Sequence, residues 1–246
     1  FTLVRNFKEV PLILEPYMTD EHPVDVPKSS ESAIIAQIKE DITTALSSGG
    51  AKEFYDDEEW EGMSKGRVTK WALCALMADV CLWSEDYDGC VKYVEEITES
   101  SANFRPVFVE DSEQWFNIFN PGNSNGSVFE INFSEKDFES DQSGNSPSHI
   151  YPWGRSQVNS YQFSKAMCSR LYAEAQLEST RGIKATFNTM SGNLGTNANW
   201  YFIWKFQGYG IGSDAQRDTK DANWILYRMA DVLLMKAEAL IWKGGE

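Results

Sequence analysis

The sequence has few residues of the kinds that bind metals, and it has no long apolar run. Its four cysteines form no CxxC pair, and its two histidines, His22 and His149, lie far apart. Because a structural zinc site needs closely spaced Cys and His ligands, we expect neither a metal site nor a cofactor. No stretch of about 20 apolar residues is present, so we expect no segment to cross a membrane.

Positive charge is also scarce. The chain has 22 Lys and Arg residues against 37 Asp and Glu residues, which gives a formal net charge of −15. A nucleic-acid surface needs clustered Lys and Arg, so nucleic acid is excluded as a partner. The same excess of acid disfavours docking on anionic lipid, whereas a neutral or a cationic ligand is compatible with it.

Aromatic residues, in contrast, are abundant. Nine Trp, ten Tyr and fourteen Phe make up 13% of the chain. Most of these rings should lie in the core, because each hides a large apolar area there. Rings in polar segments rich in Gly, Ser and Asn are harder to explain by packing. Flat rings in such segments suit ligands that also have flat apolar faces, and sugar rings have such faces.

A helix and a helix pair are predicted in the first half of the chain. Apolar residues at three- and four-residue spacing follow the N-cap candidates Ser29–Ser32. Thr69–Trp83 and Tyr87–Thr98 form two further periodic segments joined by a tight turn. The small residues Ala78 and Cys90 have the spacing of a tetratricopeptide helix pair, in which close helix approach needs small side chains.

The chain ends in a fourth periodic segment. Trp224–Trp242 predicts one long amphipathic helix. We expect four tryptophans to be packing residues of the predicted helices: Trp71, Trp83, Trp224 and Trp242. The residues of the last helix that should face inward are Leu226, Met229, Ala230, Leu233, Leu234, Ala237 and Leu240.

The part between these helices has a different texture. Val128–Phe133 alternates apolar and polar residues and predicts a strand, and Arg181–Phe187 is a candidate for a second one. Asn159–Glu178 has a helix-like middle. The segments Ser134–Ser160 and Asn193–Gly212 are long, polar and rich in Gly, Ser and Asn, as functional loops often are.

The ligand-binding residues that we expect lie in these two segments or directly after the first. No periodic core face accounts for their aromatic rings, and the polar neighbours could hydrogen-bond to sugar hydroxyls. The structural alternative is that Tyr and Trp fix the loops onto the scaffold. The expected residues are Tyr151, Trp153, Arg155, Gln157, Asn159 and Tyr161, followed by Trp200 and Tyr201. Trp204, by contrast, should lie in the core.

One stretch matches the pattern of a calcium-binding loop only in part. Asp137, Glu139 and Asp141 alternate as calcium ligands do, but Gln142 stands where the turn glycine should be. No Glu follows at the required spacing, so we expect no metal there.

Several segments resemble the SusD-like (RagB/SusD) family, in the order in which the family has them. Arg228–Leu240 is similar to the family's most specific motif, RyAdvLLmyAEAl, and Gly66–Trp83 is similar to its helix that precedes an Asp-Tyr turn. The other matching segments are Val10–Ile13 with Ile38, Asp41 and Ala45 after it, Phe129–Ile131, and Glu178 to Phe187, where the usual Asp is absent.

The resemblance implies a mainly α fold, a tetratricopeptide-like helical scaffold with a loop-rich ligand face and a few short strands. We expect a single SusD-like domain over 1–246, truncated at both ends. Its parts would be tetratricopeptide-like helices at 28–103, the loop-rich ligand face at 104–221 and a C-terminal scaffold helix at 222–246.

The resemblance also implies a function. Such a protein is not an enzyme. It captures oligosaccharides or polysaccharides on the cell surface and passes them to a SusC-like TonB-dependent transporter in the outer membrane. An N-terminal lipid anchor, absent from this chain, would hold it there. Two other classes stay open from the residues alone: a tetratricopeptide adaptor that binds protein, and a glycoside hydrolase that uses paired carboxylates.

Overall fold

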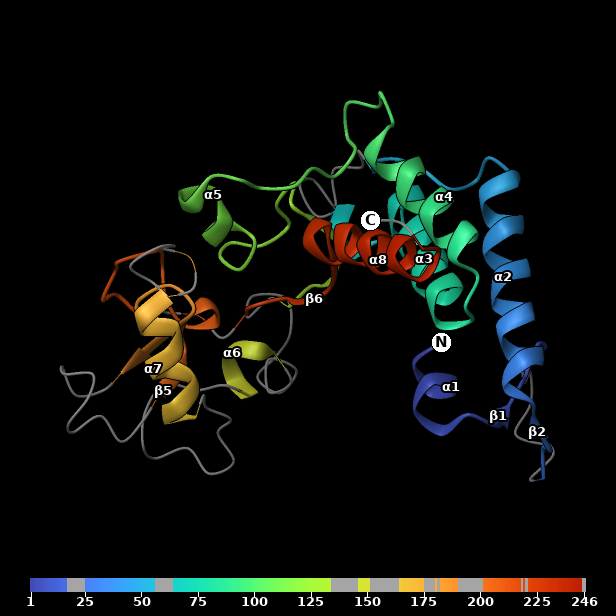
Figure 1. The fold of residues 1–246 in the computed structure, drawn as a ribbon, viewed down its shortest axis with the longest axis horizontal. Coiled ribbons are helices and arrows are strands. Elements are labelled where there is room, and N and C mark those ends of the chain that lie inside the picture. Colours follow the sequence, from blue (N-terminus) through green and yellow to red (C-terminus); the bar gives the residue numbers. More distant parts are fainter. Residues whose placement is uncertain are drawn as a thin grey trace. The chain divides into compact units, whose positions relative to one another are not determined.

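The computed structural model describes residues 1–16, 25–55, 64–133, 146–150, 164–174, 180, 182–189, 201–217, 219 and 221–244 (Figure 1). The chain is mainly helical with a few short strands, as predicted. It divides into two compact units. The first unit comprises Phe1–Glu53, Thr69–Ser101 and Val232–Glu246, and the second comprises Phe54–Val68 and Ala102–Asp231.

The first unit is helical. Ile34, Ile35 and Val80 form its buried cluster together with Val4. In Figure 1 the long α2 helix lies beside the α3–α4 pair, and α2 contacts α3. Its elements are α1 (Thr2–Phe7), β1 (Val10–Pro11), β2 (Lys28–Ser29), α2 (Glu31–Ser47), α3 (Lys70–Trp83), α4 (Tyr87–Thr98) and most of α8 (Met229–Trp242).

The predicted helix pair is confirmed. Both helices begin at capping side chains: the Thr69 hydroxyl accepts a hydrogen bond from the Ala72 N–H, and the Asp86 carboxylate accepts one from the Gly89 N–H. Ala78 and Cys90 have no exposed surface. Small side chains at these positions let α3 and α4 approach closely, as the tetratricopeptide spacing requires.

The last predicted helix is wrong in its first five residues. Trp224–Arg228 form the strand β6, and α8 begins only at Met229. β6 pairs antiparallel with β3 (Ser127–Ile131), a partner about 100 residues earlier in the chain. Helical periodicity cannot report such a distant partner. Where the strand ends, the Asp231 carboxylate accepts a hydrogen bond from the Arg228 N–H and caps the new helix.

The face that α8 buries also differs from the prediction. Val232, Met235 and Ala239 are buried, whereas five residues expected to face inward are exposed: Leu226, Leu233, Leu234, Ala237 and Leu240. The helix packs through small side chains, since the Cys90 thiol lies 3.6 Å from the Met235 carbonyl. Of the expected packing tryptophans, Trp71 is buried, Trp83 and Trp224 are half-buried, and Trp242 is exposed while its ring stacks on Tyr87.

The second unit combines short helices with paired strands. The predicted strand at 128–133 is β3, and the helix-like middle of 159–178 is α7. The second predicted strand begins later than expected, because Lys184 adopts a positive φ of 59° in a turn before Phe187. The remaining elements are η2 (Ser64–Gly66), α5 (Ser112–Asn117), α6 (Pro147–Ile150), α7 (Lys165–Glu174), β4 (Phe187–Thr189), β5 (Tyr201–Ile203) and η5 (Trp204–Phe206).

The core of this unit holds α5 against the strands. Ile118, Phe119, Phe206 and Ala222 form a buried cluster. The Phe119 and Phe206 rings meet edge to face, 5.7 Å apart. Trp204 is buried as predicted, with 1% of its surface exposed.

Glu130 fixes the turn before β3. Its carboxylate is fully buried and accepts hydrogen bonds from the Asn123 N–H at 3.1 Å and from Asn223 Nδ2 at 2.8 Å. Gly122 has φ +86°, and a Cβ there would lie 2.8 Å from Asn223 Nδ2, so glycine is required. This network holds the segment that leads to Gly126, which lines the cavity described next.

Candidate functional site

The residues predicted to bind ligand lie almost entirely outside the described part of the chain. These are Tyr151, Trp153, Arg155, Gln157, Asn159, Tyr161 and Trp200. The backbone of Tyr201 is described and pairs with Thr189 in the β4–β5 sheet, but its side chain is not. The binding role of all eight residues stays a prediction. The stretch Asp137–Gln142 is likewise outside the described residues.

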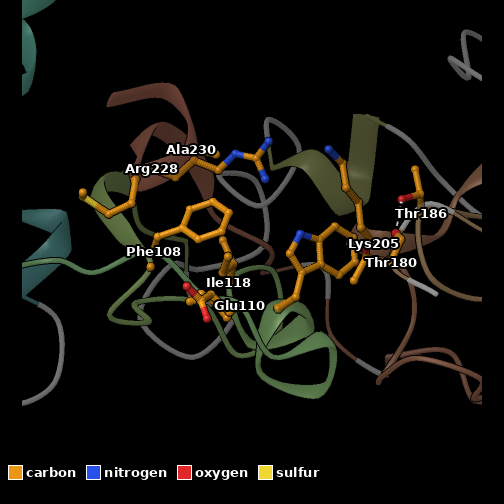
Figure 2. Close-up of a pocket in the computed structure, with 12 residues that line it drawn as sticks. Phe108, Glu110, Ile118, Thr180, Thr186, Lys205, Arg228 and Ala230 are labelled. Atoms are coloured by element: carbon orange, nitrogen blue, oxygen red, sulfur yellow. Dashed lines mark hydrogen bonds between the residues drawn. The ribbon is translucent and has the colours of Figure 1, made fainter. Parts of the chain in front are cut away.

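The second unit contains a cavity of about 540 Å³ (Figure 2). Its wall is assembled from segments distant in sequence: the chain after α4, α5, the turn before β3, the neighbourhood of β4, η5, and the junction of β6 with α8. The lining residues are Phe108, Val109, Glu110, Trp115, Ile118, Gly126, Thr180, Thr186, Lys205, Arg228, Met229 and Ala230. The volume is typical of small-molecule sites, which span roughly 300–1,000 Å³.

One side of the cavity is aromatic and aliphatic. The Trp115 ring of α5 lies 5.0 Å from the Phe119 ring, edge to face, and packs against the buried cluster to which Phe119 belongs. Phe108 is half exposed, and its segment is tied down where the Val107 N–H donates to the Asn125 carbonyl at 3.0 Å. Apolar rings with exposed faces are surfaces on which a flat ligand can stack.

Two cationic side chains line the same cavity. In Figure 2 Arg228 and Lys205 approach from opposite sides, with Phe108 and Ile118 below Arg228. Lys205 Nζ lies 4.9 Å from the centre of the Phe119 ring and 5.0 Å from that of Phe206. Arg228 Nε lies 3.5 Å from the Asp231 carboxylate.

The electrostatic environment of Lys205 is unfavourable to its charge. Burial, and after it the neighbouring Arg228, lowers the pKa of the Lys205 ammonium to about 8, while Asp231 opposes both. The desolvated ammonium therefore loses its proton more readily than an exposed lysine does, unless an anion approaches.

Polar groups complete the wall. The Thr186 hydroxyl donates to the Thr180 carbonyl at 2.6 Å (Figure 2). The backbone N–H of Trp204 donates to the Thr186 carbonyl at 2.8 Å. Among the lining residues that the structure describes, Glu110 supplies the single carboxylate. The cavity can therefore stack a ring and bind polar or negatively charged substituents, whereas its described lining lacks the pair of carboxylates that glycoside cleavage requires.

The described residues offer neither a metal site nor a membrane-spanning helix. They contain no cluster of three His, Cys, Asp or Glu side chains placed to hold a metal ion. Within the described part of the chain, no helix has the length and apolar character needed to span a bilayer.

Sequence reasoning missed Phe108, Trp115, Lys205 and Arg228 as cavity residues. Lys205 carried a usable signal, because a single cation stands between two aromatic residues in Trp204–Phe206. Arg228 was noticed only as part of a helix motif. The other members come together only through the tertiary fold.

Comparison with family models matches residues 131–246 to the SusD family. Among solved structures, a laminarin binding SusD-like protein is 20% identical with a TM-score of 0.65, over 97% of this chain and 56% of that one. Surface glycan-binding protein A from Bacteroides uniformis is 17% identical with a TM-score of 0.64, over 99% of this chain and 52% of that one.

A SusD superfamily protein from Bacteroides thetaiotaomicron is 20% identical with a TM-score of 0.71, over 96% of this chain and 48% of that one. The chain thus spans about half the length of the structures that it matches. At these identities the likeness establishes the fold. No curated protein sequence matches the chain.

Proposed function

We propose that this chain, a SusD-like protein in its fold and, over residues 131–246, in its sequence, belongs to a protein that binds glycans at the cell surface. The whole protein would be a lipoprotein of the outer membrane. It would pass its ligand to a SusC-like TonB-dependent transporter. It would bind the ligand without cleaving it.

One observation carries the glycan part of this proposal. Two solved structures share the fold of nearly the whole of this chain, and their names describe them as laminarin binding and as glycan-binding. The cavity of the second unit supports it, because Trp115 and Phe108 offer ring faces beside polar groups that could bind hydroxyls. The predicted loop residues around Trp153 would extend the binding surface.

A glycan array probed with the full-length protein tests this function. We expect saturable binding to at least one class of oligosaccharide and to none of the nucleic-acid probes printed beside them. Trp153→Ala should weaken that binding about tenfold or more, because stacking of a sugar face on the indole would be lost. A folded protein that binds no glycan would contradict the proposal, and unchanged affinity in Trp153→Ala would contradict the loop assignment.

The transporter and the membrane anchor need a separate test. Purification of the tagged protein from outer membranes should recover a TonB-dependent transporter in stoichiometric amount. Recovery of the protein from the cytosol, with no transporter bound, would contradict this part of the proposal.

A further inference from the structure

Lys205 and Arg228 place two positive charges in one cavity, and the described residues do not neutralise the charge of Lys205. Both side chains line one cavity and repel each other, as the influence of Arg228 on Lys205 shows. Among the residues that the structure describes, no carboxylate lies within ion-pair distance of Lys205 Nζ. Burying an ammonium without an anionic partner is costly, so a fold that retains one here calls for an explanation.

The two nearby carboxylates are not placed to form an ion pair with Lys205. Asp231 is engaged by Arg228, since it accepts from the Arg228 N–H at 3.1 Å and lies 3.5 Å from Arg228 Nε. Glu110 lies on the other side of the Phe108 ring from the Arg228 guanidinium in Figure 2. The chain as a whole carries 37 acidic residues, yet the described lining of this cavity presents two cations and one carboxylate.

Packing of Lys205 on Phe119 and Phe206 is the simpler explanation. The ring contacts at 4.9 and 5.0 Å do favour a cation. They account equally well for the aliphatic stem, which covers apolar surface whether or not the amine is charged. They do not account for a second cation in the same cavity.

We propose that the cavity takes the negatively charged substituent of an acidic glycan, with its carboxylate or sulfate between Lys205 and Arg228 and its sugar ring on Trp115 and Phe108. The inference rests on the proposed glycan-binding function and names the ligand class of the described cavity. A planar guanidinium and an ammonium together match such a group, because Arg can bind two of its oxygens at once and Lys supplies a compact charge. The formal net charge of −15 disfavours anionic ligands in general, so binding of an acidic sugar in this cavity would depend on these two cations.

Calorimetric titration of the full-length protein with matched pairs of sugars tests the inference. Trigalacturonate and its methyl ester differ only in charge at the carboxyl groups. A sulfated carrageenan oligosaccharide and its desulfated form make the corresponding pair for sulfate. We expect one acidic member to bind at least tenfold more tightly than its neutral partner. The pair that shows the difference identifies the substituent.

Substitutions locate the effect. Lys205→Met keeps the stem against Phe119 and Phe206 and removes the desolvated charge, so the variant should fold and should lose the preference for the acidic sugar. Arg228→Gln, which leaves the Asp231 cap in place, should weaken binding of the acidic sugar independently. Lys28→Met removes one exposed positive charge from the first unit and should leave the preference unchanged. The melting temperature of each variant verifies its folding.

The outcomes separate this inference from the function on which it rests. Equal affinity for both members of each pair, or an acidic preference that survives both Lys205→Met and Arg228→Gln, overturns the inference while any measurable glycan binding leaves the proposed function standing. If the folded protein binds neither the four paired sugars nor any glycan of the array, both proposals fail together.

Discussion

Glu130 lies in β3 between the apolar residues Phe129 and Ile131, and its carboxylate has no exposed surface. Its oxygens accept from the Asn123 N–H and from Asn223 Nδ2, and Lys65 lies close enough for the charge of Glu130 to raise its pKa. Burial outweighs that attraction, so the pKa of Lys65 still falls to about 8. Glu130 is therefore expected to stabilise the turn before β3 and to have no catalytic role.

Glu130→Ala should lower the free energy of unfolding by about 3 kcal/mol, because buried donors lose their acceptor. Glu95→Gln is the matched control: its partner Lys236 is at 2.9 Å on the surface, where a pair contributes at most about 1 kcal/mol. Urea denaturation measures both. Equal losses in the two variants would show that Glu130 is not the anchor of the turn.

The titration of Lys205 gives a prediction for pH dependence. The protonated amine attracts an anion and the neutral amine does not, so affinity for an acidic glycan should be highest below the pKa of about 8 and fall as pH rises through it. The other charged groups that act on this amine or line its cavity are Arg228, Asp231 and Glu110. Calorimetry over roughly pH 6.5 to 9.5 covers both sides of this pKa. The affinity for the acidic glycan should fall over that range in the natural protein and stay constant in Lys205→Met. A flat profile in both would contradict the role of Lys205.

At the scale of elements, α3 and α4 illustrate what local sequence determines. Their caps Thr69 and Asp86 and their small contact residues are all read within a few turns of helix. Ala78→Leu should overpack this contact and cost about 1–3 kcal/mol, because Ala78 has no exposed surface. Ala237→Leu on the exposed face of α8 is the control and should change stability by less than about 0.5 kcal/mol. Equal effects in the two variants would show that the helix contact is loosely packed.

β6 illustrates what local sequence leaves undetermined. Trp224–Arg228 continue the apolar spacing of the helix after them, so periodicity extends the helix through them. Their pairing with β3 depends on a segment about 100 residues away, which a local pattern cannot contain. Because the predicted helix included this strand, the prediction also assigned the wrong inward face to α8. In the structure Val232 and Ala239 are buried and Leu234 is exposed.

At the scale of the molecule, ordered motifs predicted the fold correctly and the described cavity not at all. The motifs are contiguous segments, and their order along the chain is itself information. The cavity joins Phe108 to Arg228 across more than half of the second unit's chain length, and only the tertiary structure brings such residues together. The residues predicted to bind sugar lie almost entirely outside the described part of the chain, so their role is still a prediction.

The most direct test of the central proposal is one titration followed to its product. The full-length protein is titrated by calorimetry with the oligosaccharide that the glycan array identifies, and the same sample is then resolved by chromatography. We expect saturable binding near one site per chain, with the oligosaccharide recovered intact after prolonged incubation. Failure to bind, or the appearance of shorter sugars, would contradict the proposal that this SusD-like protein captures glycans without cleaving them.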